Sequence, residues 1–320
     1  MRKEQVVEKG EERQHRCPGE TYTINDSVCR GRQRVNYPKC NVCLDKVEPA
    51  SFDHSVGESK ISASIFKSYD IRGRYPEELD DLTARKIGSS IAHFLKEVNP
   101  KAKNIVVGRD MRISSKSLAN ALIDGICSTG MNVVNIGIVS TEMTTFAVGH
   151  YNYDGGVMVT ASHNPAAYNG FKICREQAIP LSMETGIGRI AKLTQQYHPP
   201  RGEQPGKVIL SDVFKDYKRH VLRFVDNLRN VRIVVDAGNG MAGRTVPIVC
   251  EGLPIEIIPL YFELDGTFPN HDANPLIAKN LSDLQSKVRE TRAHLGVAFD
   301  GDADRCVFVD ELGRIIGCDI

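Results

Sequence analysis

Long apolar runs are missing from this 320-residue sequence. A helix that spans a bilayer needs about 20 consecutive apolar residues, and no stretch approaches that length. Residues 1–16, MRKEQVVEKGEERQHR, have neither the apolar core of a signal peptide nor the acid-poor composition of a transit peptide. These absences predict a cytoplasmic protein without a membrane partner.

Net charge is also nearly absent. The 41 basic and 40 acidic residues leave a formal charge of +1. A chain without a strong field does not attract nucleic acid over long range, so we expect no nucleic-acid partner and expect any anion to be held by a local site. The hydrophobic share of 41% and the charged share of 25% are ordinary for a globular chain, and the length suggests about two domains.

Cysteine pairs with zinc-site spacing are scarce. Four of the nine cysteines lie near the N-terminus: Cys17, Cys29, Cys40 and Cys43. The last two form a CxxC pair, but eleven residues separate the first two, where zinc sites usually have two to four. Two interpretations stay open: the four cysteines form a zinc site, or they belong to a tail in which their thiols stay reduced. The others are interpreted as small buried side chains: Cys127, Cys174, Cys250, Cys306 and Cys318.

A change of pattern near residue 61 divides the chain. Residues 1–60 are polar and lack sustained periodicity, which predicts an irregular N-terminal extension. Beyond them, strand and helix patterns alternate, which predicts a domain with a mostly parallel sheet over residues 61–206. The expected strands are 104–108, 131–137 and 155–160, and the expected helices are 76–98, 114–130, 141–151 and 184–197.

The alternation repeats over residues 207–317, which predicts a second domain. Its expected helices are 211–226, one ending near 250, and 281–294; its expected strands are 231–236, 255–261 and 295–299, followed by a hairpin over 305–317. The glycines of DAGNGMAG (236–243) are interpreted as turn and packing glycines rather than as a nucleotide-binding loop. The predicted fold class is α/β, with two consecutive three-layer α/β/α domains. Residues 318–320 are interpreted as the truncated start of a third domain.

The stretch GGVMVTASHNPAAYNGFK (155–172) reads as a buried strand that ends in a polar loop with Ser162 and His163. A nucleophilic serine normally needs a base to take its proton. The sequence has no GxSxG elbow, which argues against an acyl-transfer hydrolase. A serine that carries a phosphoryl group remains as an interpretation, because phosphoserine adds roughly −1.5 to −2 charge that a nearby cation can neutralise.

The stretch VAFDGDADRCVFVD places Asp300, Asp302 and Asp304 directly after a second buried strand. Three carboxylates in five residues repel one another, and oxygen-only ligands suit Mg²⁺. The spacing also resembles an EF-hand, but Arg305 stands where the calcium loop needs glycine and the flanks read as strands. A solvated acidic turn and a phosphatase-type aspartate are weaker alternatives. Both polar loops follow strands, where open α/β sheets keep their sites, so we expect them to share one Mg²⁺.

Several stretches together resemble one family. TASHNP with YNGFK, and DGDADR downstream, resemble the α-D-phosphohexomutase superfamily, with the phosphomannomutase/phosphoglucomutase branch as the best match. FKSYDIRGRYPEEL (66–79), VVGRDMR (106–112), VVDAGNGMAG (234–243) and DGTFPNHDANP (265–275) follow the family's landmarks in order. The resemblance covers residues 65–320.

The resemblance implies a set of functional residues. Ser162 matches the phosphorylated serine, which with the three aspartates would hold Mg²⁺, and Arg305 matches the arginine that neutralises phosphate. The remaining catalytic residues implied are Tyr69, Arg72, His163 and Lys172, with Lys172 a candidate for proton transfer. The implied reaction moves a phosphoryl group between the 1- and 6-positions of a mannose or glucose phosphate through a hexose bisphosphate.

Family members have four domains, and the resemblance reaches only the first two. The expectation is therefore that the 320-residue chain alone turns over little or no substrate, because the parts that grip the sugar and its second phosphate are missing. Two alternatives stay open: a phosphoglucosamine mutase, and a non-catalytic two-domain relative with a binding or regulatory role. On structural grounds alone, Lys172 reads as a surface lysine and Arg72 as a partner of Asp70.

Overall fold

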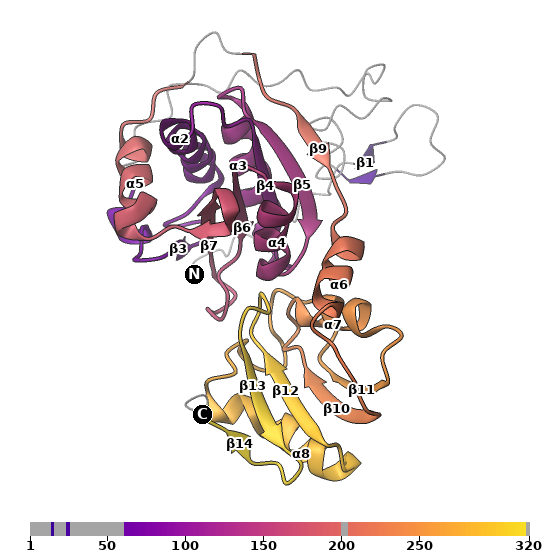
Figure 1. Cartoon of the computed structure of the whole chain (residues 1–320). Coiled ribbons are helices and arrows are strands. Elements are labelled where there is room, and N and C mark those ends of the chain that lie inside the picture. The colour runs from indigo at the N-terminus through magenta and orange to yellow at the C-terminus, as the bar shows by residue number, and fades with distance from the viewer. Residues whose placement is uncertain (1–13, 16–23, 26–60, 200–203, 318–320) are drawn as a thin grey trace, which may run out of the picture. The chain divides into compact units, whose positions relative to one another are not determined.

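The computed structural model describes residues 14–15, 24–25, 61–199 and 204–317 (Figure 1). The chain divides into two compact units, Met1–Ser59 and Lys60–Ile320. In the first unit, strand β1 (Gln14–His15) pairs antiparallel with β2 (Ile24–Asn25). The four cysteines of the proposed zinc site and the proposed start of a third domain at 318–320 lie outside the described residues.

The second unit begins with a seven-stranded sheet, which defines the first domain. The strand order is β3-β7-β6-β4-β5-β9, with β8 paired to β7. Strands β6, β4, β5 and β9 run parallel, whereas β7 is antiparallel to β3, β6 and β8. The bounds are β3 Ile71–Arg74, β4 Asn104–Arg109, β5 Asn132–Ile138, β6 Gly155–Val159, β7 Tyr168–Arg175, β8 Ile179–Pro180 and β9 Val208–Leu210.

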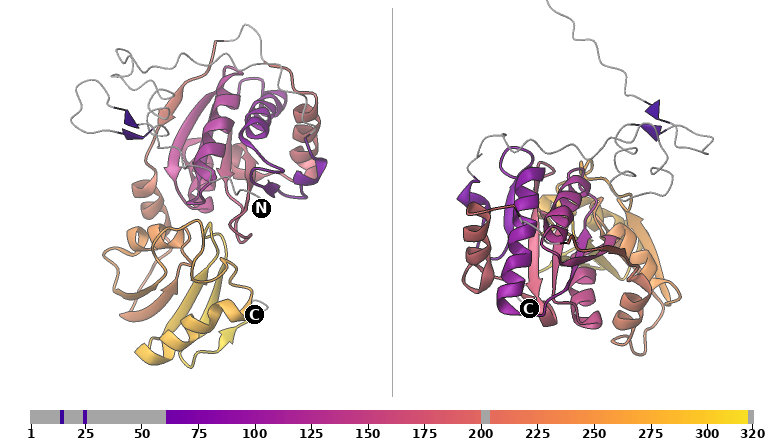
Figure 2. Two further views of the ribbon diagram at one scale, coloured as in Figure 1. Left: turned by 180° about the vertical axis from the view of Figure 1, so that it is seen from behind. Right: turned by 90° about the horizontal axis from the view of Figure 1, so that it is seen from above.

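Helices cover both faces of this sheet (Figures 1 and 2). They are α2 Asp81–Val98, α3 Ser115–Cys127, α4 Thr141–Tyr151 and α5 Gly188–Gln195, preceded by a π-helical turn at Met183–Ile187. Side chains of a strand alternate between faces. Accordingly Ile105 and Val107 of β4 pack with α2, α3 and α5, while Val106 packs with Ala147 of α4. This is the predicted three-layer arrangement.

Helix α2 begins later than the periodicity suggested, at residue 81 instead of 76. Asp80 is its N-cap, and its carboxylate accepts a hydrogen bond from the N–H of Thr83 at 2.8 Å. The preceding residues form a turn instead, in which the N–H groups of Glu78 and Leu79 both bond to the Arg74 carbonyl. The cap therefore sets the start of the helix.

Helices α2 and α3 pack with their backbones unusually close together. A Cβ atom built at Gly88 of α2 would lie 2.2 Å from the carbonyl oxygen of Leu122, and one built at Gly125 of α3 would lie 2.0 Å from that of Arg85. Neither helix position tolerates a side chain at this separation, so both glycines are required for packing rather than for backbone freedom.

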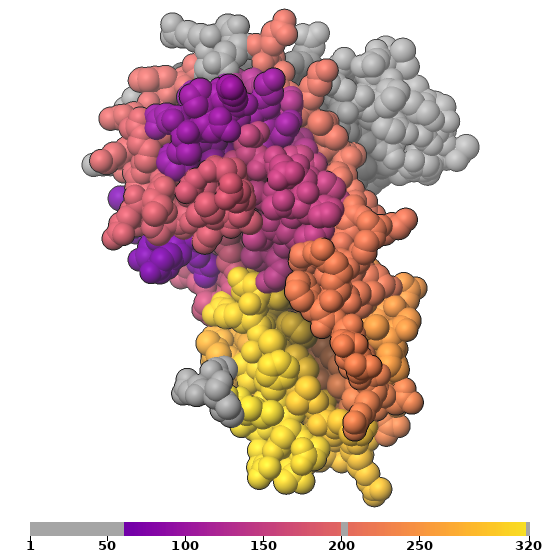
Figure 3. Space-filling view, in the orientation of Figure 1, coloured from indigo at the N-terminus to yellow at the C-terminus, as the bar shows by residue number. Residues whose placement is uncertain are grey.

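The second domain contains a five-stranded sheet in the order β11-β10-β12-β13-β14. Strand β10 is parallel to β11 and β12, and β12, β13 and β14 are antiparallel. The C-terminal part of this domain, coloured yellow, lies at the surface of the molecule in Figure 3. The bounds are α6 Phe214–Leu222, β10 Val231–Asp236, α7 Ala242–Cys250, β11 Ile255–Leu260, α8 Ser282–Thr291, β12 Leu295–Phe299, β13 Cys306–Asp310 and β14 Ile315–Ile316; shorter 3-10 turns are Ala63–Ile65, Glu176–Ala178 and Ala278–Leu281.

The predicted fold class of two consecutive α/β/α domains is confirmed, with mixed, mostly parallel sheets. Strands β3 and β7 were not predicted, because glycines and polar residues interrupt their apolar pattern. Cys127 and Cys174 are buried as expected. The same expectation is wrong for Cys250, which is partly exposed, and for Cys306, which lies on the exposed face of β13.

The glycine loop of the second domain packs against backbone. Gly238, Gly240 and Gly243 do match the spacing of a dinucleotide-binding loop. A Cβ at Gly240 would lie 2.7 Å from the Gly301 carbonyl oxygen, and one at Gly243 would lie 2.1 Å from that of Phe262. These contacts agree with packing glycines. Among the described residues, no helix has the length and apolar character needed to cross a membrane.

Candidate active site at the serine and aspartate loops

The serine loop follows directly from β6. Ser162 is almost completely buried and has a φ angle of 52°, in the left-handed region. A residue with a Cβ rarely adopts this conformation unless its surroundings hold it there. The Ser162 N–H donates to the Thr160 hydroxyl at 2.9 Å, which is one such constraint.

Arg112 supplies further constraints on the serine loop. Its guanidinium is fully buried and donates to four carbonyl oxygens of the loop: Ser162 at 2.8 Å, Asn164 at 2.6 Å, Pro165 at 2.8 Å and Tyr168 at 3.1 Å. We call this set of bonds the arginine clamp. Because one rigid side chain holds four points of the loop, it fixes where the Ser162 hydroxyl lies.

The charge of the clamp is balanced inside the first domain. Arg112 Nε lies 3.2 Å from Asp110 Oδ2, and Asp110 is fully buried. Burial lowers the pKa of Arg112 and raises that of Asp110, and each partner opposes the shift of the other. Sequence reasoning included both residues in a landmark but assigned them no role. The signal was an Asp and an Arg two positions apart at the end of a buried strand.

The aspartate loop joins β12 to β13. The two strands are antiparallel, with Phe299 opposite Cys306, so residues 300–305 form a short loop between neighbouring strands. Carboxylate oxygens of Asp300, Asp302 and Asp304 lie within 4.8 Å of one another. The flanking strands contradict the EF-hand alternative, which requires helices on both sides.

The two loops meet although 138 residues separate them. The Ser162 hydroxyl donates to Asp300 Oδ2 at 2.7 Å. Arg305 Nη2 donates to the same hydroxyl oxygen at 2.5 Å and forms an ion pair with Asp300 at 3.0 Å. The same nitrogen also contacts His163 Nδ1. A phosphoryl group on Ser162 would therefore lie beside both a guanidinium and the carboxylate cluster.

Asp302 is the most enclosed carboxylate of the cluster. Its Oδ2 accepts from Lys172 Nζ at 2.6 Å and from the Thr141 hydroxyl at 2.5 Å. Its Oδ1 is buried and has no hydrogen-bond partner among the described residues. Lys172 also contacts Asp304, so one ammonium group serves two carboxylates. A buried carboxylate oxygen without a partner is costly unless another ligand satisfies it.

The pKa values show an excess of negative charge. Burial and the neighbouring Asp302 and Asp304 raise the pKa of Asp300 to about 7. Burial and the same two aspartates also raise the pKa of Glu142, to about 8. Burial would raise the pKa of Asp302 as well, but Lys172 and Thr141 lower it on balance. A bound cation would relieve this repulsion.

These residues fit a hard divalent cation. The three carboxylates offer oxygen ligands only, and one of the oxygens is buried without a hydrogen-bond partner in the described part of the chain. Burial and the neighbouring carboxylates raise the pKa of Asp300 to about 7. Thiolate and imidazole ligands, which softer metals prefer, are absent from the cluster itself.

Comparison with known proteins identifies the family. The family model for α/β/α domain I of phosphoglucomutase/phosphomannomutase matches residues 63–199, and the model for domain II matches residues 215–313. The chain belongs to this family. Membership confirms the expected resemblance to the α-D-phosphohexomutase superfamily.

Relatives and solved structures agree with the family models. A phosphomannomutase of Vibrio cholerae is 39% identical over 79% of this chain and 56% of its own length, and a protein of Xanthomonas campestris named for phosphohexose mutases is 42% identical over 78% and 55%. A phosphoglucomutase/phosphomannomutase family protein from Burkholderia thailandensis superposes with a TM-score of 0.73 at 36% identity, covering 80% of this chain and 56% of that one. The chain thus spans just over half the length of the relatives it matches.

Of the remaining predicted residues of this family member, Arg72 and His163 make contacts at the serine loop. Arg72 forms the ion pair with Asp70 that the sequence suggested, and it also donates to the Asn164 side chain at 2.7 Å. Burial, Arg305 and Arg72 lower the pKa of His163. Tyr69 is 77% exposed, so the structure does not bring it into the cluster.

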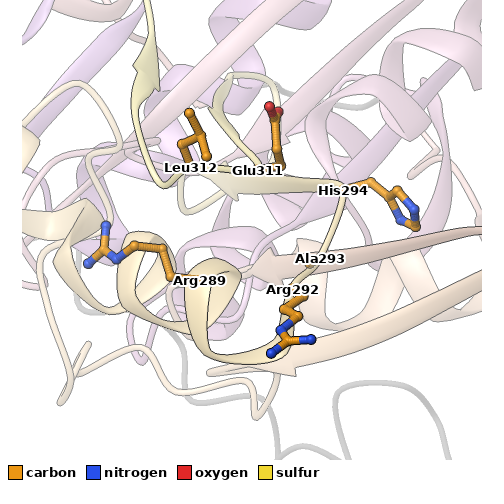
Figure 4. Close-up of a pocket in the computed structure, with 6 residues that line it drawn as sticks. All are labelled: Arg289, Arg292, Ala293, His294, Glu311 and Leu312. Carbon is orange, nitrogen blue, oxygen red and sulfur yellow. The ribbon is translucent and has the colours of Figure 1, made fainter.

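A separate cavity of about 410 Å³ lies at the C-terminal end of α8 (Figure 4). It is lined by Arg289, Arg292, Ala293, His294, Glu311 and Leu312. The charged ends of these side chains point in different directions in Figure 4, and a carboxylate accompanies the basic groups. This arrangement offers no converging set of ligands, unlike the serine and aspartate loops.

Proposed function

We propose that this chain forms the phosphoserine and Mg²⁺ domains of a phosphohexomutase. The enzyme would move a phosphoryl group between the 1- and 6-positions of a mannose or glucose phosphate through a hexose bisphosphate. The observation that carries the proposal is the position of the Ser162 hydroxyl, 2.7 Å from Asp300 and 2.5 Å from Arg305. A transferable group on that oxygen is placed where its charge can be neutralised.

Each residue of the site has a proposed task in this reaction. Asp300, Asp302 and Asp304 would hold Mg²⁺, which when bound supplies positive charge to the phosphoryl oxygens. Arg305 neutralises charge at the serine oxygen in both directions of transfer. Lys172, whose ammonium group bonds to Asp302 and Asp304 beside the serine loop, is proposed to exchange a proton with the attacking hydroxyl.

Two further groups orient the reactants. His163 keeps a neutral imidazole beside Arg305, since its pKa is lowered, and can accept a hydrogen bond at Nδ1. Arg72 is anchored by Asp70 and Asn164 at the margin of the site, and with exposed Tyr69 it is proposed to approach the sugar. Positioning of this kind is a large part of catalysis when little covalent chemistry is required of the protein.

The domain limits are part of the proposal. We assign residues 61–206 to the phosphoserine domain, extended by β9 (Val208–Leu210), which pairs with β5 of its sheet, and the following residues up to 317 to the metal domain. The relatives are nearly twice as long as the matched region, so recognition of the sugar is proposed to need parts that correspond to the rest of their length. The 320-residue chain should therefore acquire phosphate on its serine more readily than it turns over hexose phosphate.

The decisive experiment follows phosphate on Ser162. Incubation of the chain with glucose 1,6-bisphosphate and Mg²⁺ should add one phosphate to the peptide that contains Ser162, as located by tandem mass spectrometry. Ser162→Ala should remove the modification, and Ser182→Ala, which changes a helix-capping serine in the first domain, should not. EDTA should prevent it.

Two results would contradict the proposal. One is phosphate that appears on Ser162→Ala to the same extent, which would place the acceptor elsewhere. The other is a wild-type chain that binds a divalent cation but stays unmodified, which would favour a non-catalytic relative. Mannose and glucosamine 1,6-bisphosphates used in parallel would separate the mannose/glucose assignment from a phosphoglucosamine mutase.

A further inference from the structure

Helix α4 of the first domain begins against the aspartate loop of the second domain. The N–H of Thr141, its first residue, donates to the Asp302 carbonyl oxygen at 3.1 Å, and the Thr141 hydroxyl donates to Asp302 Oδ2 at 2.5 Å. Ser140, at the N-cap position, makes no capping hydrogen bond with its side chain. Asp302 therefore takes over the role that an N-cap residue normally fills.

The contact places a helix N-terminus, which carries a partial positive charge, against a carboxylate that is completely buried.

The contact also determines which oxygen stays available. Thr141 and Lys172 both bond to Oδ2 of Asp302, and the buried Oδ1 has no partner in the described part of the chain. Lys172 shares its ammonium group with Asp304 and has a long flexible side chain. Thr141 is β-branched and set in a helix, so its hydroxyl has few rotamers and fixes the carboxylate plane more firmly.

We propose that Thr141 is a positioning residue of the metal site, which holds Asp302 so that Oδ1 is the oxygen offered to the cation. The inference rests on the proposed metal site and adds to it a residue from the opposite domain that is not itself a ligand. It makes cation affinity depend on the contact between α4 and the aspartate loop. Outer partners of metal ligands typically change metal affinity by about 10–100-fold when removed.

The test uses three variants of the full 320-residue chain and Mn²⁺ as the probe. Thr141→Val removes the hydroxyl with little change of volume, and Thr141→Ser keeps a hydroxyl at the same position. Thr145→Val is the matched control, because Thr145 lies one turn later on α4 and donates only to the Thr141 carbonyl at 3.3 Å. Free and bound Mn²⁺ are measured by electron paramagnetic resonance at pH 7.5.

The Kd for Mn²⁺ should rise about 10–100-fold in Thr141→Val and stay near the wild-type value in Thr141→Ser and Thr145→Val. Wild-type affinity in Thr141→Val would overturn the proposal, and so would an equal loss in Thr145→Val, which would indicate a general weakening of α4. Melting temperatures measured in EDTA would show such a weakening, because they report the stability of each variant without a bound cation. A failure of the proposed function can be distinguished from a failure of this inference. In that case Ser162 would stay unmodified, while the Mn²⁺ affinities of the wild type and Thr141→Val would still differ.

Discussion

The two α/β/α domains have cores of different depth. In the first domain, buried clusters fill both faces of the sheet, and all five residues of β6 are buried. In the second domain, one smaller cluster packs against α8, residues of β11 are only partly buried or exposed, and β13 alternates between buried and exposed positions. The serine loop therefore belongs to a domain with a large apolar core, and the aspartate loop belongs to a domain with a small one.

This difference indicates how each loop is held. Apolar burial stabilises a fold by about 25 cal/mol per Å², so the first domain has more of this stabilisation available. Part of this stabilisation offsets the cost of burying the charged Arg112 and of holding Ser162 in the left-handed conformation. Polar contacts that hold the second domain include the His271–Asp236 pair and the bonds that the first domain makes to Asp302.

The largest effect is expected from the arginine clamp. Arg112→Met leaves Asp110 buried without its charge partner and removes the donors from four loop carbonyls. Loss of one member of a buried ion pair typically costs about 3–5 kcal/mol. Urea denaturation should show a loss of this size, and Ser162 should no longer accept phosphate. Arg175→Met, which breaks a part-exposed pair with Glu176, should cost less than about 1 kcal/mol.

A pair of leucine truncations compares the two cores directly. Leu122 and Leu284 are both fully buried, in the first and second domain respectively. Leucine-to-alanine changes cost about 2–5 kcal/mol, depending on how far the surroundings collapse. Leu122→Ala should lie near the upper limit and Leu284→Ala near the lower one, as measured by urea denaturation with hydrogen exchange of each domain. A greater cost for Leu284→Ala would contradict the contrast between the cores.

The smallest effect concerns the pH dependence of the second domain. His271 Nε2 lies 3.0 Å from Asp236 Oδ2, and its Nδ1 lies 2.9 Å from the Asp272 carbonyl oxygen. Burial lowers the pKa of His271, but Asp236 and the Asp272 carbonyl raise it on balance. Because the folded pKa lies above the unfolded one, the stabilisation is complete below about pH 6.5 and is lost as the pH rises through the folded pKa.

His271→Asn should remove this dependence. The free energy of unfolding should fall by on the order of 1 kcal/mol at pH 6 and by less at pH 9. Thermal unfolding across this pH range measures it, with His294→Asn as the control, because His294 is an exposed histidine of the same domain that accepts from the Arg232 N–H. A difference between wild type and His271→Asn that does not change with pH would exclude the charged pair.

Much of this molecule could be predicted from the sequence, for a physical reason. Strands β4, β6 and β12 contain short apolar runs with turn residues near their ends, and these local patterns predict the strands. A serine and carboxylates at the ends of two such strands also predicted that the two loops meet, although β6 and β12 belong to different sheets. The residues of the candidate site could thus be named from local patterns.

The supporting contacts could not be predicted in the same way. Arg112 bonds to carbonyl oxygens, which every residue possesses, so the identities of its partners carry no signal. Thr141 was expected only as the start of a helix, and its contact with Asp302 depends on how two domains meet. Strand β7 was obscured by the glycine and asparagine at its start, whose burial results from the neighbouring strands.

The distance along the chain between the serine and the aspartate loop has a consequence for synthesis. A nascent chain that ends at Phe299 already contains Ser162, Arg112 and every carbonyl of the clamp, since all of these belong to the first domain. It contains none of the three aspartates. Translation thus completes the serine loop and its arginine clamp long before the aspartate loop, which begins only after the last residue of β12.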